Sequence, residues 1–435
     1  MVESRDKTKV VFHKGTHTIG GTLVEVAYKK SRIFFDLGAV FDPQVTVLSL
    51  DDLLENKLVT YVDGLYDPRA FDKPVREKED SYSHQAAFIS HAHLDHTSII
   101  NFTNPTMDLY ASADTVKVLK AMSVDDDFIF PFSKNQEKSK KNIRPIKGLS
   151  YFESVDIGDL KVTLIPVDHD AYGACGFLIE SPRMTIAYTG DIRSHGFRPD
   201  LTETFIEKVK GADLLISEGV SFSFYKLGED DQEENLSEKE VVGEFERLLK
   251  ENKDRQLTFS YYPTNFERIR EIYEKTKDLR KLVLTSFNAY LVKEVLGFDL
   301  PYYKISEKDY GLDPKLEISL DELLEDRGEY LWQMDVKKLD LIDYLQEKSL
   351  YIHSDAEPLG DFDPFYQIFL EKLEKKNIDI ALVKSSGHAK TRDLYQIISK
   401  INPKLLAPIH SFNPEWVYYY SDRLLNPSDG DVILF

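Results

Sequence analysis

The densest group of metal-binding side chains in this sequence is the run His91-Ala-His93-Leu-Asp95-His96. It follows the apolar segment 85–90, whose pattern predicts a buried strand. A loop that leaves such a strand can direct alternate side chains to one point. Because imidazole and carboxylate groups bind borderline-soft cations, His91 and His93 suit one ion, while Asp95 and His96 suit a second beside it. This run alone predicts a metal-dependent hydrolase.

Two further elements place a ligand type directly after an apolar segment. Segment 161–166 leads to His169, which would complete the protein ligands of the first ion, and segment 184–188 leads to Asp191. The two carboxylate oxygens of Asp191 can bridge two cations. Asp36 ends another apolar run, and we expect it to accept a hydrogen bond that orients the ligand loop. A simple turn-forming role is the alternative for Asp36.

Composition limits the class of protein and the kind of metal site. A chain of 435 residues exceeds one ordinary core and predicts two domains, and 42% hydrophobic residues indicate a folded protein. The net charge of −20 argues against a broad surface that coats nucleic acid. The single Cys175 excludes a disulfide framework and a thiolate zinc site. Without a recognisable signal peptide or an apolar run of membrane-spanning length, we expect a cytoplasmic protein with no membrane partner.

Hydrophobic patterning divides the chain into three stretches. The first is patterned as short strands, the second, from about residue 221, alternates strands with helices, the first of them capped at Ser237, and the last returns to strands that bear histidines. Residues 303–350 are charge-rich and mostly helical in pattern. A further helix is expected from Thr391. The expected strands cover 22–28, 31–36, 85–90, 161–166, 176–180, 184–188, 213–217, 256–260, 281–285, 378–383, 404–410 and 431–435.

Taken together, these elements resemble the metallo-β-lactamase fold, an αββα sandwich with a dinuclear metal site at one edge of its sheets. Three later elements are similar to the β-CASP branch of that superfamily, which includes RNase J. They are Glu218 in Ile-Ser-Glu-Gly, His388 in Ser-Gly-His and His410 in Pro-x-His. The match extends over nearly the whole chain. It implies an α/β fold in which an inserted β-CASP domain at 221–375 divides the metallo-β-lactamase domain into 1–220 and 376–435. This chain departs from RNase J proteins in that the C-terminal domain they carry is not expected.

The resemblance also assigns roles to individual residues. It implies that His388 contacts phosphate and that Glu218 is its acidic partner, although a helix-capping histidine is the alternative for His388. The implied ligands are His91, His93 and His169 for one ion and Asp95, His96 and His410 for the other, with Asp191 shared. Chemistry agrees with the placement of His410, because the N-terminal half supplies no second neutral ligand for the second ion.

The expected chemistry is hydrolysis by two divalent cations. Two ions about 3.5–4 Å apart lower the pKa of a bridging water to about 7, so that hydroxide can attack a phosphate at neutral pH. Zinc is expected and manganese is the alternative, because a His/Asp site without cysteine accepts either. We expect Asp191, Glu218 and His388 to act in catalysis, the last of them by stabilising the phosphate.

The substrate is predicted less directly than the metal site. The resemblance implies a ribonuclease-like phosphodiesterase that acts on single-stranded RNA or DNA, and a homo-oligomer is left open. A hydrolase of small phosphoesters or other esters, or a non-catalytic RNA-binding relative, remains as the alternative. The basic segment 134–147 could grip a nucleic-acid backbone, but a solvated loop is the simpler interpretation. Aromatic residues of the insert could stack bases or fill its core, namely Tyr261, Tyr262, Phe287 and Tyr290.

Overall fold

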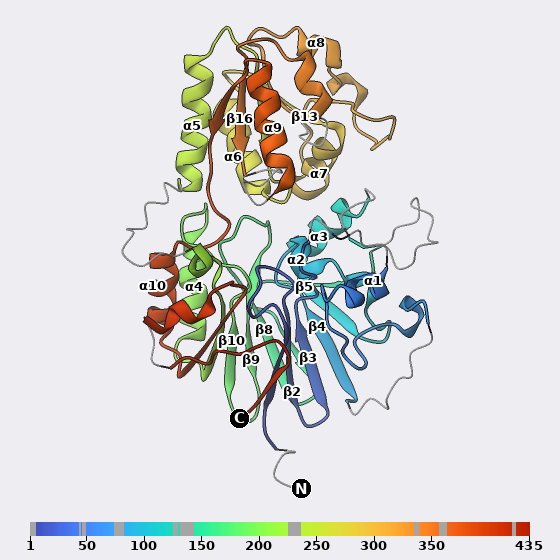
Figure 1. Ribbon diagram of the computed structural model, residues 1–435, viewed down its shortest axis with the longest axis vertical. Coiled ribbons are helices and arrows are strands. Elements are labelled where there is room, and N and C mark those ends of the chain that lie inside the picture. Colours follow the sequence, from blue (N-terminus) through green and yellow to red (C-terminus); the bar gives the residue numbers. More distant parts are fainter. Residues whose placement is uncertain are drawn as a thin grey trace. The chain divides into compact units, whose positions relative to one another are not determined.

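The computed structural model describes residues 6–42, 45, 49–73, 82–124, 129–130, 143–224, 236–334, 339–355, 363–419 and 423–435. The chain forms two compact units. Unit 1 comprises residues 1–232 and 387–435, and unit 2 comprises residues 233–386 (Figure 1). Within the described ranges, none of the helices combines the length and the apolar character needed to cross a membrane.

Unit 1 is built on two sheets that face each other. The seven-stranded sheet has the order β19 (Asp431–Leu434), β1 (Lys9–Lys14), β2 (Leu23–Tyr28), β3 (Ser31–Phe35), β4 (His84–Phe88), β5 (Asp108–Ser112) and β6 (Lys147–Leu149). The six-stranded sheet has the order β18 (Leu405–Ile409), β11 (Leu214–Glu218), β10 (Thr185–Tyr188), β9 (Cys175–Glu180), β8 (Leu160–Pro166) and β7 (Ser154–Ile157). β3 to β6 are parallel, as are β10, β11 and β18.

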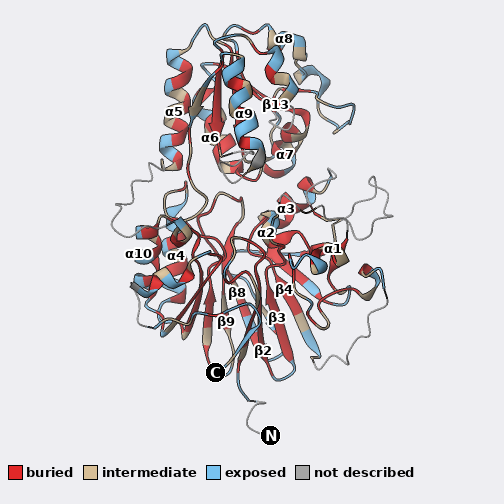
Figure 2. Cartoon of the chain, in the orientation of Figure 1, coloured by how far each residue is buried: buried red, intermediate tan, exposed pale blue. Residues whose placement is uncertain are grey.

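The main core of unit 1 lies between these sheets. Phe35 and Phe88 of the first sheet and Phe177 and Tyr188 of the second belong to one buried cluster. Side chains two residues apart on a strand point to the same face of the sheet. Val162 and Leu164 of β8 therefore both face this cluster. Figure 2 shows most strand residues of unit 1 in the colour of buried residues, which agrees with their almost continuous apolar sequences.

Helices complete the sandwich. The outer face of the six-stranded sheet packs against α4 (Pro199–Val209) and α10 (Thr391–Ile401) through a second buried cluster (Figure 1). On the seven-stranded sheet, α3 (Ala113–Met122) contacts β5 and β6. Two shorter helices, α1 (Leu50–Glu55) and α2 (Leu94–Thr97), precede α3 in the sequence. The result is the expected αββα arrangement.

Unit 2 is a parallel sheet with helices between its strands. The strand order is β14 (Tyr302–Tyr303), β13 (Lys281–Thr285), β15 (Tyr330–Gln333), β12 (Leu257–Tyr261), β16 (Leu350–Ser354) and β17 (Asp379–Leu382). The helices are α5 (Glu238–Glu251), α6 (Phe266–Thr276), α7 (Ser286–Leu296), α8 (Leu320–Leu324) and α9 (Pro364–Lys375). Ser237 and Glu240 form the expected capping box at the start of α5.

A buried ion pair joins two helices of unit 2. The guanidinium of Arg268 on α6 donates to both carboxylate oxygens of Glu238 on α5, each at 2.8 Å, and both side chains are fully buried. The same guanidinium bonds Asp355 and the carbonyl oxygen of Ser385. Removing one partner of such a pair is destabilising, because the other charge stays buried.

Two features differ from the sequence expectations. The units divide at 232/233 and 386/387, about a dozen residues after the expected boundaries. The later division follows from β17, which pairs with β16 of unit 2 instead of joining the first unit. Residues 303–350 are also not mostly helical, because they contain β15 and the start of β16 in the buried sheet. The charged residues of the neighbouring turns obscure the apolar pattern of these two short strands in the sequence.

Candidate metal centre

The ligand run predicted from the sequence begins at the end of a parallel strand. β4 ends at Phe88, and the chain then passes through His91 and His93 into α2, which carries Asp95 and His96. Segments after β8, β10 and β18 bring His169, Asp191 and His410 to the same place. Each of these strands ends in the buried sandwich, so the polar side chains gather at one edge of both sheets.

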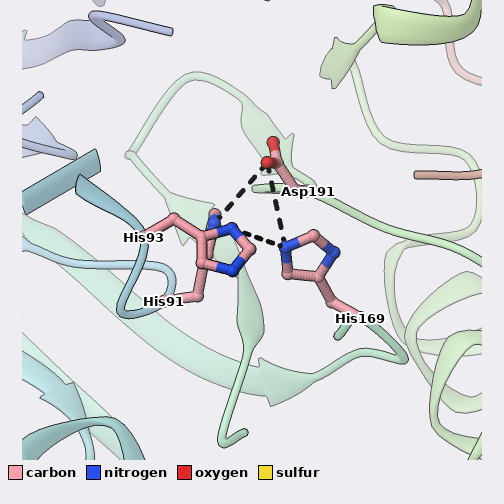
Figure 3. A group of neighbouring side chains, drawn as sticks. All are labelled: His91, His93, His169 and Asp191. Carbon is pink, nitrogen blue, oxygen red and sulfur yellow. Dashed lines mark hydrogen bonds and ion pairs between the residues drawn. The ribbon is translucent and has the colours of Figure 1, made fainter. Parts of the chain in front are cut away.

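The first group contains His91, His93, His169 and Asp191, whose ligand atoms lie within 4.8 Å of one another. Figure 3 shows the three imidazole rings and the carboxylate directed toward one another. Oδ2 of Asp191 lies 3.5 Å from Nε2 of His91 and 3.9 Å from Nε2 of His169. Nδ1 of His93 lies 3.3 Å from Nε2 of His169.

The second group contains Asp95, His96 and His410, again within 4.8 Å of one another. Oδ2 of Asp95 lies 3.6 Å from Nε2 of His96 and 3.4 Å from Nε2 of His410. The Asp191 carboxylate reaches this group too, since its Oδ2 is 3.3 Å from Nε2 of His96 and 3.9 Å from Nε2 of His410. Asp191 therefore lies between the two groups, as a bridging ligand would.

The donor set fits divalent cations. Among the described residues, Nε2 of His91, His96 and His410 and Oδ1 of Asp191 are buried and make no hydrogen bond. Buried polar atoms without partners are costly and rare in proteins. Two atoms that each lie 2.0–2.2 Å from a shared ion are separated by about 3.0–3.5 Å, which is close to several of the separations found here. Both groups could thus each hold one cation.

Hydrogen bonds on the far side of the rings turn these nitrogens toward the centre. Nδ1 of His96 lies 2.8 Å from Oδ2 of Asp36 and must donate, because a carboxylate only accepts. Ser90 Oγ donates to the same oxygen at 2.9 Å. The serine hydroxyl has one proton, so it accepts a hydrogen bond from Nδ1 of His91, also at 2.9 Å. Asp36 is fully buried and also accepts from Ser90 N and the Tyr188 hydroxyl. This carboxylate therefore sets the orientation of two rings.

Burial and neighbouring charges shift the pKa values of the cluster. Burial, followed by the neighbouring imidazoles of His96 and His169, holds the pKa of His91 well below its usual value. Burial raises the pKa of Asp191, but the imidazoles of His96 and His410 outweigh it and hold this pKa well below the ordinary range. A neutral imidazole and an ionised carboxylate are the forms that bind metal.

His388 and Glu218 lie beside the bridging carboxylate. Nδ1 of His388 is 3.5 Å from Oε1 of Glu218 and 3.8 Å from Oδ2 of Asp191. Burial lowers the pKa of His388, but these two carboxylates outweigh burial and raise it to about 9. The other Glu218 oxygen accepts from the backbone N–H of Val220 at 2.9 Å, which fixes the carboxylate. The His388 side chain is 22% exposed, so it is the member of this pair that substrate can reach.

Sequence reasoning missed several residues around the centre. Thr22 Oγ1 lies 2.9 Å from Nδ1 of His410, and Ser90 and Tyr188 both bond Asp36. Neither Thr22 nor Tyr188 belongs to a motif of ligand residues, so nothing in their local sequence marks them. Asp170 follows His169 directly, and this adjacency was a signal that could have been used.

Other candidates lie elsewhere or beyond the described ranges. Residues 134–142 of the basic segment lie outside the described ranges. In unit 2, Tyr261 is buried with its hydroxyl near Asn288, which makes it a core residue. Phe287 and Tyr290 are partly exposed and pack against each other and against Tyr310.

Comparison with known proteins agrees with this geometry. A model of the β-lactamase superfamily domain matches residues 58–229. Residues 58–229 are therefore a β-lactamase superfamily domain, and the chain is similar to proteins named RNase J-like protein and ribonuclease J. A solved protein of unknown function from Enterococcus faecalis is 42% identical, with a TM-score of 0.89, over 99% of this chain and 100% of that one.

The relatives with functional names are more distant. An RNase J-like protein from Methanocaldococcus jannaschii is 27% identical over 219 residues, which are 48% of this chain and 41% of that protein. Ribonuclease J from Mycoplasma pneumoniae is 21% identical, and that from Mycoplasma genitalium is 22% identical. Both alignments cover 93% of this chain and 68% of the relative. The chain thus spans less than half of the first relative and about two thirds of the other two.

Proposed function

We propose that the protein is a dinuclear metal-dependent phosphodiesterase that cleaves single-stranded RNA. The observation that carries this proposal is the pair of buried ligand groups that share Asp191, with His388 and Glu218 beside them. The names of the ribonuclease J relatives support RNA as the substrate class. On this proposal unit 2 is a β-CASP domain, and the cytoplasm, where RNA is turned over, is the compartment of action.

The ligand assignment follows the two groups. His91, His93 and His169 would hold the first cation, Asp95, His96 and His410 the second, and Asp191 both. Zinc suits the four-coordinate mixture of nitrogen and oxygen donors, and manganese is the alternative. Two bound divalent cations supply Lewis acidity toward phosphate oxygens and lower the pKa of a water molecule to about 7.

The remaining residues act on the phosphate and the leaving group. In the metal-free centre the carboxylates of Asp191 and Glu218 raise the pKa of His388 to about 9, which favours the protonated ring. A protonated imidazole can donate a hydrogen bond to a non-bridging phosphate oxygen and stabilise the charge that develops there. It can also deliver its proton to the leaving oxygen. Glu218, fixed by the Val220 N–H, keeps the ring in place for either role.

Cleavage of labelled single-stranded RNA tests the proposal. Purified protein loaded with zinc or manganese should cleave the RNA, and chelation by EDTA should abolish the activity. His93→Ala should lose it, whereas Lys400→Ala, an exposed change on α10, should not. Parallel assays with single-stranded DNA and chromogenic small phosphodiesters and esters distinguish the alternatives. Hydrolysis of the small compounds without cleavage of RNA would replace the proposal with a small-ester hydrolase.

A further inference from the structure

Two exposed phenylalanines lie in segments that leave the candidate centre. Phe412 comes two residues after His410, and it is 53% exposed. Phe224, which is 59% exposed, is the last residue of the 3-10 helix η4 (Val220–Phe224), and this helix starts two residues after Glu218. Single exposed apolar side chains are common on protein surfaces and need no explanation. Two large ones beside the same polar site would form a binding surface.

The segments that carry the two phenylalanines are bonded to each other. The backbone N–H of Phe412 donates to Oγ of Ser223 at 2.9 Å, and Oγ of Ser411 lies 3.0 Å from the same oxygen. A Cβ atom at Gly219 would lie 3.3 Å from Cβ of Ser411, so the chain after β11 runs against the chain after β18. Phe224 directly follows Ser223, and its backbone is therefore close to that of Phe412. The two exposed phenyl groups thus belong to one surface of unit 1.

This surface adjoins the residue that is proposed to contact phosphate. Two residues of chain span at most about 7 Å, which limits the separation between the Cα atoms of Phe412 and His410. The imidazole rings of His410 and His388 lie 5.9 Å apart between their centroids. The side chain of His388 is 22% exposed, so a substrate can reach it. A phosphate held at His388 would therefore lie close to the segment that carries Phe412.

Nucleobases are the ligands whose chemistry fits this surface. A phenyl ring can stack on any base, because every base has a π-face, and proteins that hold single strands use this contact. The ring also covers apolar area of a flat base, which a sugar or a phosphate does not offer. Stacking needs no positive charge on the protein, and this chain has a net charge of −20. The surface would thus add contacts with bases to the contacts with phosphate at the metal centre.

We propose that Phe412, with Phe224 beside it, stacks on the nucleobases next to the phosphate that is cleaved. This inference rests on the proposed function, because it takes RNA as the substrate and names the part of the nucleotide that these side chains contact. Recognition through the faces of bases makes binding largely independent of sequence. It also favours unpaired strands, since neighbouring base pairs cover the faces of bases in a duplex. A small ester without a base gains nothing from these two side chains.

Binding of two matched oligomers tests the proposal without relying on cleavage. Fluorescence anisotropy measures the affinity of EDTA-treated protein for a labelled single-stranded RNA and for an abasic ribose–phosphate chain of the same length. Phe412→Ala should bind the RNA about 5- to 150-fold more weakly than wild type, and the abasic chain equally well. Phe412→Tyr keeps an aromatic ring and should bind the RNA as wild type does. Phe365→Ala changes a phenylalanine of α9 that is 62% exposed, and this matched control should leave both affinities unchanged.

The outcomes separate this inference from the proposed function. Unchanged RNA affinity in Phe412→Ala, or an equal loss for RNA and the abasic chain, would overturn stacking by Phe412 even where metal-loaded wild type cleaves RNA. The expected loss for RNA alone, in a protein that does not cleave RNA when loaded with zinc or manganese, would overturn the proposed function and leave the stacking surface in place. Wild type that binds neither oligomer would overturn both proposals. Phe224→Ala should also weaken binding of the RNA alone, and equal affinities there would remove Phe224 from the surface.

Discussion

At the scale of single residues, the centre depends on the atoms behind the imidazoles. Asp36 accepts from His96 directly and reaches His91 through Ser90, while the Gly387 carbonyl holds His169. These contacts keep the proton on Nδ1 and the lone pair on Nε2. The sequence could mark these residues as candidate ligands because their residue types are distinctive. It could not identify Thr22, because a threonine near a turn has many ordinary roles.

Thr22→Val should weaken binding of the second ion. The variant keeps the shape of the side chain but removes Oγ1, which lies 2.9 Å from Nδ1 of His410; Gly20 N lies 3.4 Å from the same nitrogen. Loss of a partner behind a metal-binding histidine costs about 10- to 100-fold in metal affinity. Calorimetric titration with Zn²⁺ measures the change, and Thr204→Val on α4 is the control. Equal affinities in both variants would show that Thr22 does not position His410.

His388→Gln should reduce the rate of cleavage while leaving metal content unchanged. General acid–base catalysis typically contributes about 10²- to 10⁴-fold, so kcat should fall within that range. Protonated His388 is the active form, and its pKa is raised to about 9. Cations bound to Asp191 would lower this pKa. Activity should therefore be lost on an alkaline limb that lies below pH 9, as the pH rises through the pKa of His388. An alkaline limb that persists in His388→Gln would contradict the assignment.

At the scale of elements, the sequence predicted most strands of the first unit because they are apolar runs bounded by turns. The strand at 281–285 and the helix that begins at Thr391 agree with the structure. Residues 303–350 were predicted incorrectly, because β15 has only four residues and lies between charged turns. The strand at Asp379–Leu382 was predicted but assigned to the wrong domain, since patterning does not reveal which sheet a strand joins.

Gly38→Ala should disturb the ligand loop through a backbone contact. A Cβ atom at position 38 would lie 1.5 Å from the carbonyl oxygen of Asp95. Because this oxygen belongs to the backbone, rotation of a side chain could not relieve the clash. The added methyl group should cost about 1–3 kcal/mol of stability and weaken binding of the second ion. Gly243→Ala on α5 has open space around it and should instead stabilise by about 0.8–1 kcal/mol. Thermal unfolding and metal titration measure both effects, and equal unfolding temperatures would contradict the prediction.

At the scale of the whole molecule, every ligand of the candidate centre lies in unit 1, although the sequence separates them by unit 2. The ligand His410 follows the insert, as does His388, while the other ligands precede it. The resemblance to a known family predicted this return of the chain, which patterning alone could not. The net charge of −20 opposes a polyanionic substrate, so we expect the bound cations to carry much of the attraction for phosphate.

The number of divalent ions bound per chain tests the dinuclear centre most directly. Inductively coupled plasma mass spectrometry of protein purified without chelator, at known protein concentration, gives this number. The proposed centre predicts two ions in wild type. It predicts at most one tightly bound ion in His410→Ala, because that change removes a ligand of only the second group. One ion or none in wild type, or two equally retained ions in His410→Ala, would contradict it.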